Sequence, residues 1–139
     1  MKITICGSMT FAIEMLEYQR RLESRGHTCL LPHETEKWAA GEFHEDDRST
    51  FMVKRKIAHN LIKRHYEKIA KSDAILVLNL TKGDIRHYIG ANTFLEMGFA
   101  HILGLRIFLL HQLPDNPYIR EGAEAMQPTV LYGNLSQVI

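Results

Sequence analysis

A single carboxylate lies in an otherwise apolar stretch of this chain. From Tyr88 through Leu105 the sequence reads YIGANTFLEMGFAHILGL, and Glu96 is its only acidic residue. A lone acid in such a segment costs stability unless it faces a cleft, has a partner, or serves in chemistry. Glu96 is therefore the first candidate for a catalytic carboxylate. The alternative is an acid on the solvent side of a helix.

The residues around Glu96 predict a helix that begins after Gly90 and ends at Gly104. On that helix Asn92 lies one turn before Glu96 and shares its face. We expect Asn92 to position the carboxylate by donating a hydrogen bond. The apolar residues expected to pack on a sheet are Phe94, Leu95, Phe99, Ile102 and Leu103.

A glycine turn near the N-terminus is the second candidate site. Gly7, Ser8 and Thr10 follow the strand-like run KITIC at residues 2–6. A turn that leads into a helix offers backbone N–H groups and a positive dipole end to an anion. We expect this turn to contact an anionic group of a ligand. Simple capping of the helix by Ser8 or Thr10 is the alternative.

The segment 79–88, NLTKGDIRHY, supplies further polar groups. Lys82 or Arg86 could hold a phosphate, and Asp84 a ribose hydroxyl. Asn79 at its start and Gly90 just beyond it are assigned to the same binding site. A solvated loop is the alternative for any single residue here.

The elements that must position these groups alternate along the chain. Strands are predicted at 2–6, 28–31, 74–78, 106–110 and 129–132. Helices are predicted from Thr10 to Gly26, from Ser49 to about Lys71, around Glu96, and at 118–126, with a loop at 32–48. This order indicates an α/β fold, a parallel sheet with helices on both faces. Ligands bind such sheets beyond the carboxyl ends of the strands, which favours the turn at 7–10 and the loops 79–92 and 111–117.

Composition narrows the functional classes. The chain has 139 residues, 45% of them hydrophobic and 24% charged, with a net charge of +1. One domain, 1–139, is expected, with no general attraction to nucleic acid or membranes. Cys6 and Cys29 lie in apolar strand-like contexts and are expected to be buried thiols. Without an apolar run long enough to cross a bilayer, a soluble cytoplasmic protein is the expectation.

Two charged segments are further candidates for binding sites. The helix 49–71 carries a basic stripe that could bind nucleic acid, although the near-zero net charge makes a solvated face the better interpretation. Its members are Lys54, Arg55, Lys56, Lys63, Arg64, Lys68 and Lys71. The run 44–47, HEDD, lacks ligand spacing with a second cluster, so no metal or other cofactor is expected.

Three segments together resemble the nucleoside 2-deoxyribosyltransferase-like family, including its deoxynucleoside 5′-monophosphate N-glycosidases. They are Gly7-Ser8 after the first strand, Ser72-Asp73 before AILVL, and YIGANTFLEMGFAHILGLRIFLL. The resemblance implies a flavodoxin-like three-layer sandwich with a five-stranded parallel sheet. It also implies a small-molecule nucleoside or nucleotide ligand and a homo-oligomer. The family's Glu-x-Gly-x-Ala signature falls on Glu96. In the family this glutamate attacks the anomeric carbon of the sugar, so the resemblance implies that role for Glu96.

The chain departs from the family pattern at three places. An aspartate thought to handle the departing base is replaced by His65, which can still exchange a proton near neutral pH. Gly90 stands where transferases carry an acid, with Asp84 upstream as a stand-in. The first turn lacks the arginine-rich sequence of the monophosphate hydrolases, which leaves the need for a 5′-phosphate open.

Two functional hypotheses follow. The first is a transferase or hydrolase of N-glycosidic bonds in nucleosides or nucleoside 5′-monophosphates, with Glu96 as nucleophile, Asn92 as positioner and His65 as acid. The second is a non-catalytic nucleotide-binding or sensor module of the same fold. Sugar type, base identity and the choice between transfer and hydrolysis stay open at this stage.

Overall fold

The computed structural model describes residues 1–43 and 50–139. The acidic run 44–47 and the predicted helix cap Ser49 lie outside the described residues.

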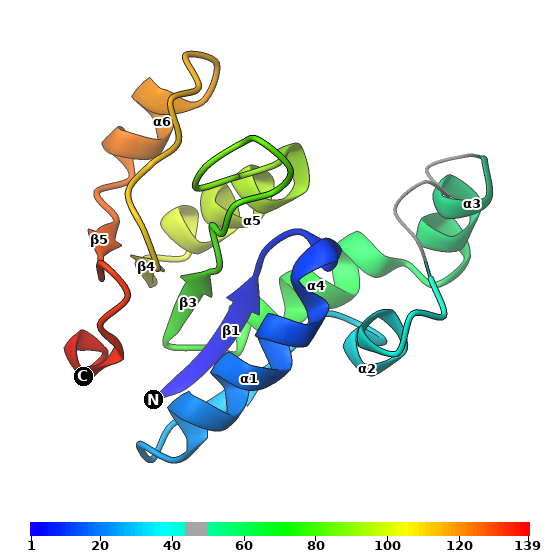
Figure 1. Cartoon of the computed structure of the whole chain (residues 1–139), viewed down its shortest axis with the longest axis horizontal. Helices are drawn as coiled ribbons and strands as arrows, with labels where there is room; N and C mark the ends of the chain where they lie inside the picture. The colour runs from blue at the N-terminus through cyan, green and yellow to red at the C-terminus, as the bar shows by residue number, and fades with distance from the viewer. Residues whose placement is uncertain (44–49) are drawn as a thin grey trace.

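Five parallel strands form one sheet (Figure 1). They are β1 (Lys2–Cys6), β2 (Thr28–Leu30), β3 (Ala74–Val77), β4 (Arg106–Leu109) and β5 (Thr129–Val130), in the spatial order β2-β1-β3-β4-β5. That is the flavodoxin-like order, so the predicted fold class is confirmed. Because β1 pairs with β2 on one side and β3 on the other, the chain changes direction of winding at β1. Ligand sites of such sheets lie beside that switch point.

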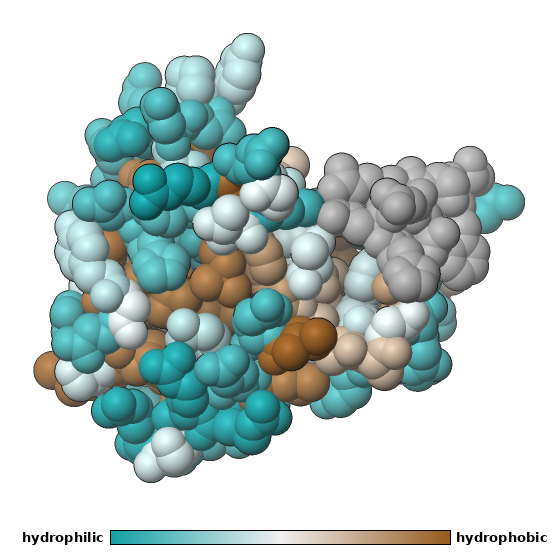
Figure 2. All heavy atoms as spheres, in the orientation of Figure 1, coloured by the Kyte–Doolittle hydropathy of each residue, from teal (hydrophilic) through white to brown (hydrophobic). Residues whose placement is uncertain are grey.

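Helices cover both faces of the sheet. On one face lie α1 (Ala12–Glu23) and the short 3-10 helix η3 (Leu135–Gln137). On the other lie α4 (Leu61–Ala70), α5 (Ala91–Ile102) and α6 (Arg120–Ala125). Figure 1 shows α1 on the viewer's side of the sheet, with α4 and α5 behind it. Figure 2 shows, in the same view, apolar side chains gathered between α1 and the C-terminal segment.

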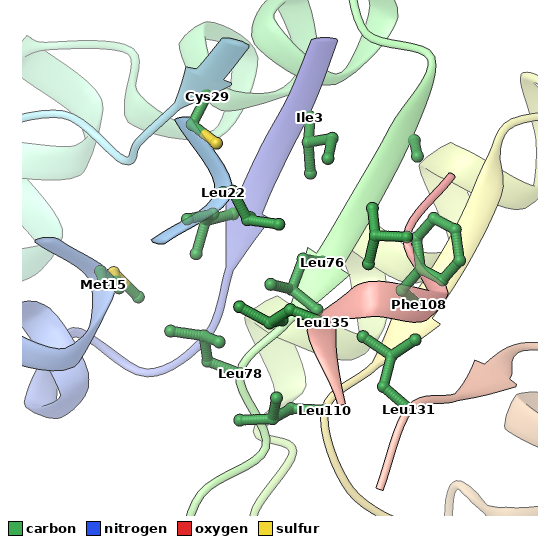
Figure 3. Close-up of a cluster of buried hydrophobic side chains, with 13 residues drawn as sticks. Ile3, Met15, Leu22, Cys29, Leu76, Leu78, Phe108, Leu110, Leu131 and Leu135 are labelled. Carbon is green, nitrogen blue, oxygen red and sulfur yellow. The ribbon is translucent and has the colours of Figure 1, made fainter. Parts of the chain in front are cut away.

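Strand periodicity divides the core between the two faces. In β3, Leu76 packs in the cluster under α1 and η3, which Figure 3 shows, while Ile75 and Val77 point to α4, α5 and α6. All three side chains are fully buried. A continuous apolar run such as AILV is what a central strand with both faces covered requires.

The predicted helix 49–71 is wrong in one respect, because it is two helices. These are α3 (Thr50–Ala58) and α4, and the break between them falls at Asn60. Asn60 has φ 51°, in the left-handed region, which an α-helix cannot include. On α4, the second of these helices, His65 is buried.

Three other boundaries differ from the predictions. The segment 32–48, expected to be a loop, contains the short helix α2 (Thr35–Ala39). It begins where the Thr35 hydroxyl donates to the Pro32 carbonyl at 2.7 Å. The helix expected from Thr10 starts as a 3-10 turn, η1 (Met9–Phe11), capped by Ser8. The last strand has only two paired residues.

The expected sheet-facing side of α5 is right for Phe94 and Phe99, which pack against the core cluster on this face, and wrong for the other three residues. Ile102 is 85% exposed, and Leu95 and Leu103 are exposed as well. The buried side chains are instead Thr93, Met97 and Ala100. These positions follow the i, i+4, i+7 spacing of one helical face. Glu96 precedes Met97 on the helix and therefore lies at the edge of the buried face.

No helix among the described residues combines the length and the apolar character needed to span a bilayer.

Candidate active site

A cavity of about 420 Å³ opens beyond the carboxyl end of β1, between the Gly7–Met9 turn and the first turns of α5. Side chains of α2, α3 and α4 complete its wall. Its lining residues include Gly7, Ser8, His33, Trp38, Arg55, Lys56, His65, Lys82, Tyr88, Gly90, Asn92, Thr93, Glu96 and Phe99. The position agrees with the binding rule for parallel sheets of this order.

Three chemically reactive side chains meet at one side of this cavity. They are Cys6 at the end of β1, His65 on α4 and Glu96 on α5. The His65 Nε2 atom lies 3.2 Å from Glu96 Oε2 and 3.4 Å from Cys6 Sγ. Cys6 is fully buried, His65 is 7% exposed, and the Glu96 side chain is 18% exposed. Glu96 and His65 line the cavity, whereas Cys6 lies behind them.

The contact between His65 and Glu96 is close but poorly aligned. At 3.2 Å it satisfies the distance of an ion pair, yet Glu96 Oε2 has no hydrogen-bond partner among the described residues. The buried Nδ1 atom of His65 has none either. Buried polar atoms nearly always have a hydrogen-bond partner in native proteins. The two atoms without one, His65 Nδ1 and Glu96 Oε2, therefore mark a place where a ligand atom can bind.

The thiol of Cys6 is held in its protonated form. Burial raises the pKa of Cys6 well above its ordinary value, and the adjacent Glu96 carboxylate raises that pKa further by repulsion and by hydrogen bonding. A thiolate beside a carboxylate in a buried site would place two negative charges together. Cys6 is therefore an unreactive thiol in the free protein.

The glycine turn and the loop after β3 form a second part of the wall. The Ser8 hydroxyl accepts a hydrogen bond from the Thr10 amide at 3.3 Å and one from Lys82 Nζ at 3.3 Å. The Lys82 ammonium also lies 4.5 Å from the centre of the Tyr88 ring. A Cβ atom on Gly90 would come within 2.7 Å of the Tyr88 hydroxyl. Glycine at 90 thus lets Tyr88 lie flat beside Lys82.

The opposite wall is cationic and aromatic. Arg55 forms an ion pair with Glu34 and lies 4.5 Å over the Phe43 ring. Burial lowers the pKa of His33, and the nearby Arg64 lowers it further. Glu34 therefore balances the Arg55 charge, and the lowered pKa favours neutral His33. Lys56 supplies positive charge on this side of the cavity, and Trp38 supplies a stacking surface.

Six of the nine predicted site residues line the cavity: Gly7, Ser8, His65, Gly90, Asn92 and Glu96. Asn92 is exposed, and no hydrogen bond joins it to Glu96 in the part of the chain that the structure describes. Thr10 lies outside the lining but bonds to Ser8.

Asn79 and Asp84 lie elsewhere. Asn79 is fully buried and donates to the carbonyls of His111 and Gln112 at 2.8 and 2.9 Å, and it accepts from the His111 amide. It therefore fixes the loop after β4 instead of facing the cavity. Asp84 lines a separate hollow formed with the 112–116 segment.

The residues that sequence reasoning missed come from segments far apart in the chain. Cys6 was expected only to be buried, and Trp38 lay in a segment expected to be a loop. Arg55 was counted in a basic stripe, but it is buried and paired. Lys68 of the same stripe donates to the Leu31 carbonyl at 2.6 Å. Two members of the basic stripe, Arg55 and Lys68, therefore make contacts within the fold.

No protein-family model matches the chain, and no curated protein matches it. Among solved structures the chain is similar to a CMP N-glycosidase of Clostridium botulinum, with 16% identity and a TM-score of 0.49, over 94% of this chain and 85% of that chain. It is also similar to a conserved protein of Enterococcus faecalis V583, with 18% identity and a TM-score of 0.47, over 91% of this chain and 74% of that chain.

Proposed function

We propose that this protein cleaves the N-glycosidic bond of nucleoside 5′-monophosphates, with Glu96 as the nucleophile. One observation carries the proposal. Glu96 provides the only carboxylate among the described residues that line the cavity, and its Oε2 atom has no hydrogen-bond partner there. A partly exposed carboxylate with free lone pairs in a cleft suits attack on an anomeric carbon.

The reaction has two steps. In the first, a Glu96 oxygen forms a bond to C1′ while the C1′–N bond breaks, and the electron pair of that bond leaves with the base, which takes up a proton. In the second, water attacks C1′ and releases the sugar phosphate and the free carboxylate. A second base in place of water would give transfer.

His65 is placed to orient the nucleophile. Its Nε2 atom lies 3.2 Å from Glu96 Oε2 and 3.4 Å from Cys6 Sγ, so a small rotation of the imidazole would let a proton on Nε2 bond to the carboxylate. We propose that His65 fixes the carboxylate for attack, and that its exchange of a proton with the departing base is secondary. This refines the acid role that the resemblance gave to His65.

The charges of the wall favour a phosphorylated substrate. Lys56 and Lys82 line the cavity together with Arg55, which is paired with Glu34, and Glu96 is the one acidic residue among the described lining residues. Lys82 and the Ser8 hydroxyl lie together beside the glycine turn, which suits a phosphate. The Trp38 and Phe99 rings offer faces on which a base can stack.

The experiment is a turnover assay with a matched control. Wild type is incubated with ribo- and deoxynucleosides and their 5′-monophosphates, with and without an acceptor base, and free or exchanged base is measured. Glu96→Gln should abolish turnover, whereas Glu67→Gln, an exposed acid of α4, should retain it. Turnover that survives in Glu96→Gln contradicts the nucleophile assignment. Nucleotide binding without turnover in wild type supports the non-catalytic binding module instead.

We also propose a homo-oligomer. Apolar side chains are exposed on α3 and near the cavity mouth, among them Val53 at 57%, Ile57 at 75% and Leu95 at 44%. Burying them against another copy would contribute stability in proportion to the apolar area removed from water. Light scattering after size-exclusion chromatography tests this, and a monomer at working concentration contradicts it.

A further inference from the structure

The three side chains that meet beside the cavity could also bind a metal ion. They are those of Cys6, His65 and Glu96. Their ligating atoms, one sulfur, one imidazole nitrogen and one carboxylate oxygen, all lie within 4.8 Å of one another. Each comes from a different element: β1, α4 and α5. The three elements pack together in the core cluster that contains Cys6, Ile69 and Met97.

The spacing matches that of a tetrahedral zinc ion. Zinc binds sulfur at about 2.3 Å and nitrogen or oxygen at about 2.0–2.2 Å, which places tetrahedral donor atoms about 3.3–3.6 Å apart. The two separations measured from His65 Nε2 are 3.2 Å to Glu96 Oε2 and 3.4 Å to Cys6 Sγ. The third separation, between Cys6 Sγ and a Glu96 oxygen, lies within 4.8 Å. An ion can contact all three atoms once the side chains of Cys6 and Glu96 adjust toward each other.

One of the three ligand atoms is unpaired in the free protein, and the other two, Cys6 Sγ and His65 Nε2, are hydrogen-bonded to each other. Glu96 Oε2 is buried and without a hydrogen-bond partner among the described residues, although His65 lies beside it. A thiol, an imidazole and a carboxylate form a mixed set that suits Zn²⁺ among divalent metals. Because Glu96 and His65 border the cavity, an ion has an entry path.

We propose that Cys6, His65 and Glu96 bind one Zn²⁺ ion, with its fourth coordination position facing the cavity. The Cys6 sulfur gives up its proton to solvent and uses the freed electron pair for the Zn–S bond. His65 Nε2 and a Glu96 oxygen each supply a lone pair. No redox change is involved.

Zinc at this position inhibits N-glycosidic cleavage, a consequence that rests on the proposed function. A Glu96 oxygen bonded to zinc has lost the lone pair with which it attacks C1′. The ion also occupies the floor of the cavity where the sugar must lie. Since binding displaces a thiol proton, zinc affinity and inhibition both increase as pH rises.

Metal binding is tested without reference to activity. The reduced protein is dialysed against Zn²⁺ and its metal content measured, and Co²⁺ is then added as a probe whose absorption reports thiolate ligation. Wild type should retain about one metal per chain and show the thiolate-to-cobalt band. Cys6→Ser should bind zinc about 100-fold or more weakly, because even outer-shell partners are worth about 10- to 100-fold in metal affinity.

Cys29→Ser is the matched control. Cys29 is also a buried thiol, but it belongs to the core cluster on the opposite face of the sheet. It should retain zinc as wild type does, and circular dichroism checks that both variants fold. No retained zinc in wild type, or equal zinc affinity in Cys6→Ser, overturns the site.

Inhibition is measured as the ratio of activities with and without Zn²⁺ in each protein, so that changes in basal activity cancel. The ratio should fall in wild type and in Cys29→Ser. Zinc that binds and leaves the ratio unchanged, or raises it, overturns the inhibitory consequence. If the protein has no glycosidase activity, the proposed function fails while the dialysis and cobalt measurements still decide the metal site.

Discussion

Lys82 provides a sharp test of the proposed phosphate site. Its ammonium lies 3.3 Å from the Ser8 hydroxyl and 4.5 Å from the centre of the Tyr88 ring, in a half-buried position on the cavity wall. Lys82→Met keeps a chain of similar length and removes the charge. A nucleoside 5′-monophosphate should lose an ammonium partner, whereas the corresponding nucleoside should lose nothing of comparable strength.

The magnitude follows from the kind of contact. A hydrogen bond to a charged group is worth about 1.5–3 kcal/mol, which corresponds to about 10- to 150-fold in the dissociation constant. Losing the contact between Lys82 and the Tyr88 ring changes the wall for both ligands equally. The diagnostic quantity is therefore the ratio of the nucleoside and monophosphate dissociation constants.

The assay is calorimetric titration of each ligand into Lys82→Met in a Glu96→Gln background, which prevents turnover. Lys63→Met is the control, because Lys63 is exposed on α4 and does not line the cavity. Added salt should weaken monophosphate binding to the parent protein more than to Lys82→Met. Equal weakening of nucleoside and monophosphate would refute the assignment of Lys82 to the phosphate, and so would no change in either.

Three further predictions concern the framework of the site. Asn79→Ala should lower the free energy of unfolding by about 1–3 kcal/mol, seen as a lower urea midpoint, because it removes three hydrogen bonds from a fully buried side chain to the backbone of His111 and Gln112; an unchanged midpoint contradicts this. Gly90→Ala should weaken monophosphate binding about two- to fivefold by displacing Tyr88 and its ring contact with Lys82, and equal affinity would show that the ring adapts. Burial raises the pKa of Cys29 from 9.0 to about 11, so in Cys6→Ser protein the rate of thiol alkylation should keep rising with pH up to about 11; a plateau near pH 9 contradicts the shift.

Much of the architecture could be predicted because it is encoded locally. The apolar run at 74–78 is long enough only for a strand and lacks a polar face, so a central parallel strand was the natural interpretation. Alternating strands and helices then restricted the topology. The break at Asn60 escaped prediction because asparagine adopts the left-handed conformation only where tertiary packing favours it, and no glycine or proline marks the position.

The candidate site could be predicted only in part. Local sequence signals mark four residues that line the cavity. The signals are a turn after a strand and an acid among apolar residues, and the four residues are Gly7, Ser8, Gly90 and Glu96. Asn79 was assigned to the site because it is a polar residue at the end of a predicted strand. The side-chain amide of Asn79 instead donates a hydrogen bond to the carbonyl of His111, which lies 32 residues away in sequence, in the loop after β4.

The sequence by itself determined the order of strands and helices and the choice of Glu96 as the central acid, since both depend on the types of neighbouring residues. Only the tertiary structure decided what surrounds that acid. Cys6, His65 and Glu96 are separated by 59 and 31 positions, and they meet because parallel pairing of β1 with β3 brings α4 and α5 to the same face. The buried thiol and imidazole beside the carboxylate give the site its proposed chemistry and its proposed affinity for zinc. Contacts across such distances depend on packing and on strand register, which no local pattern records.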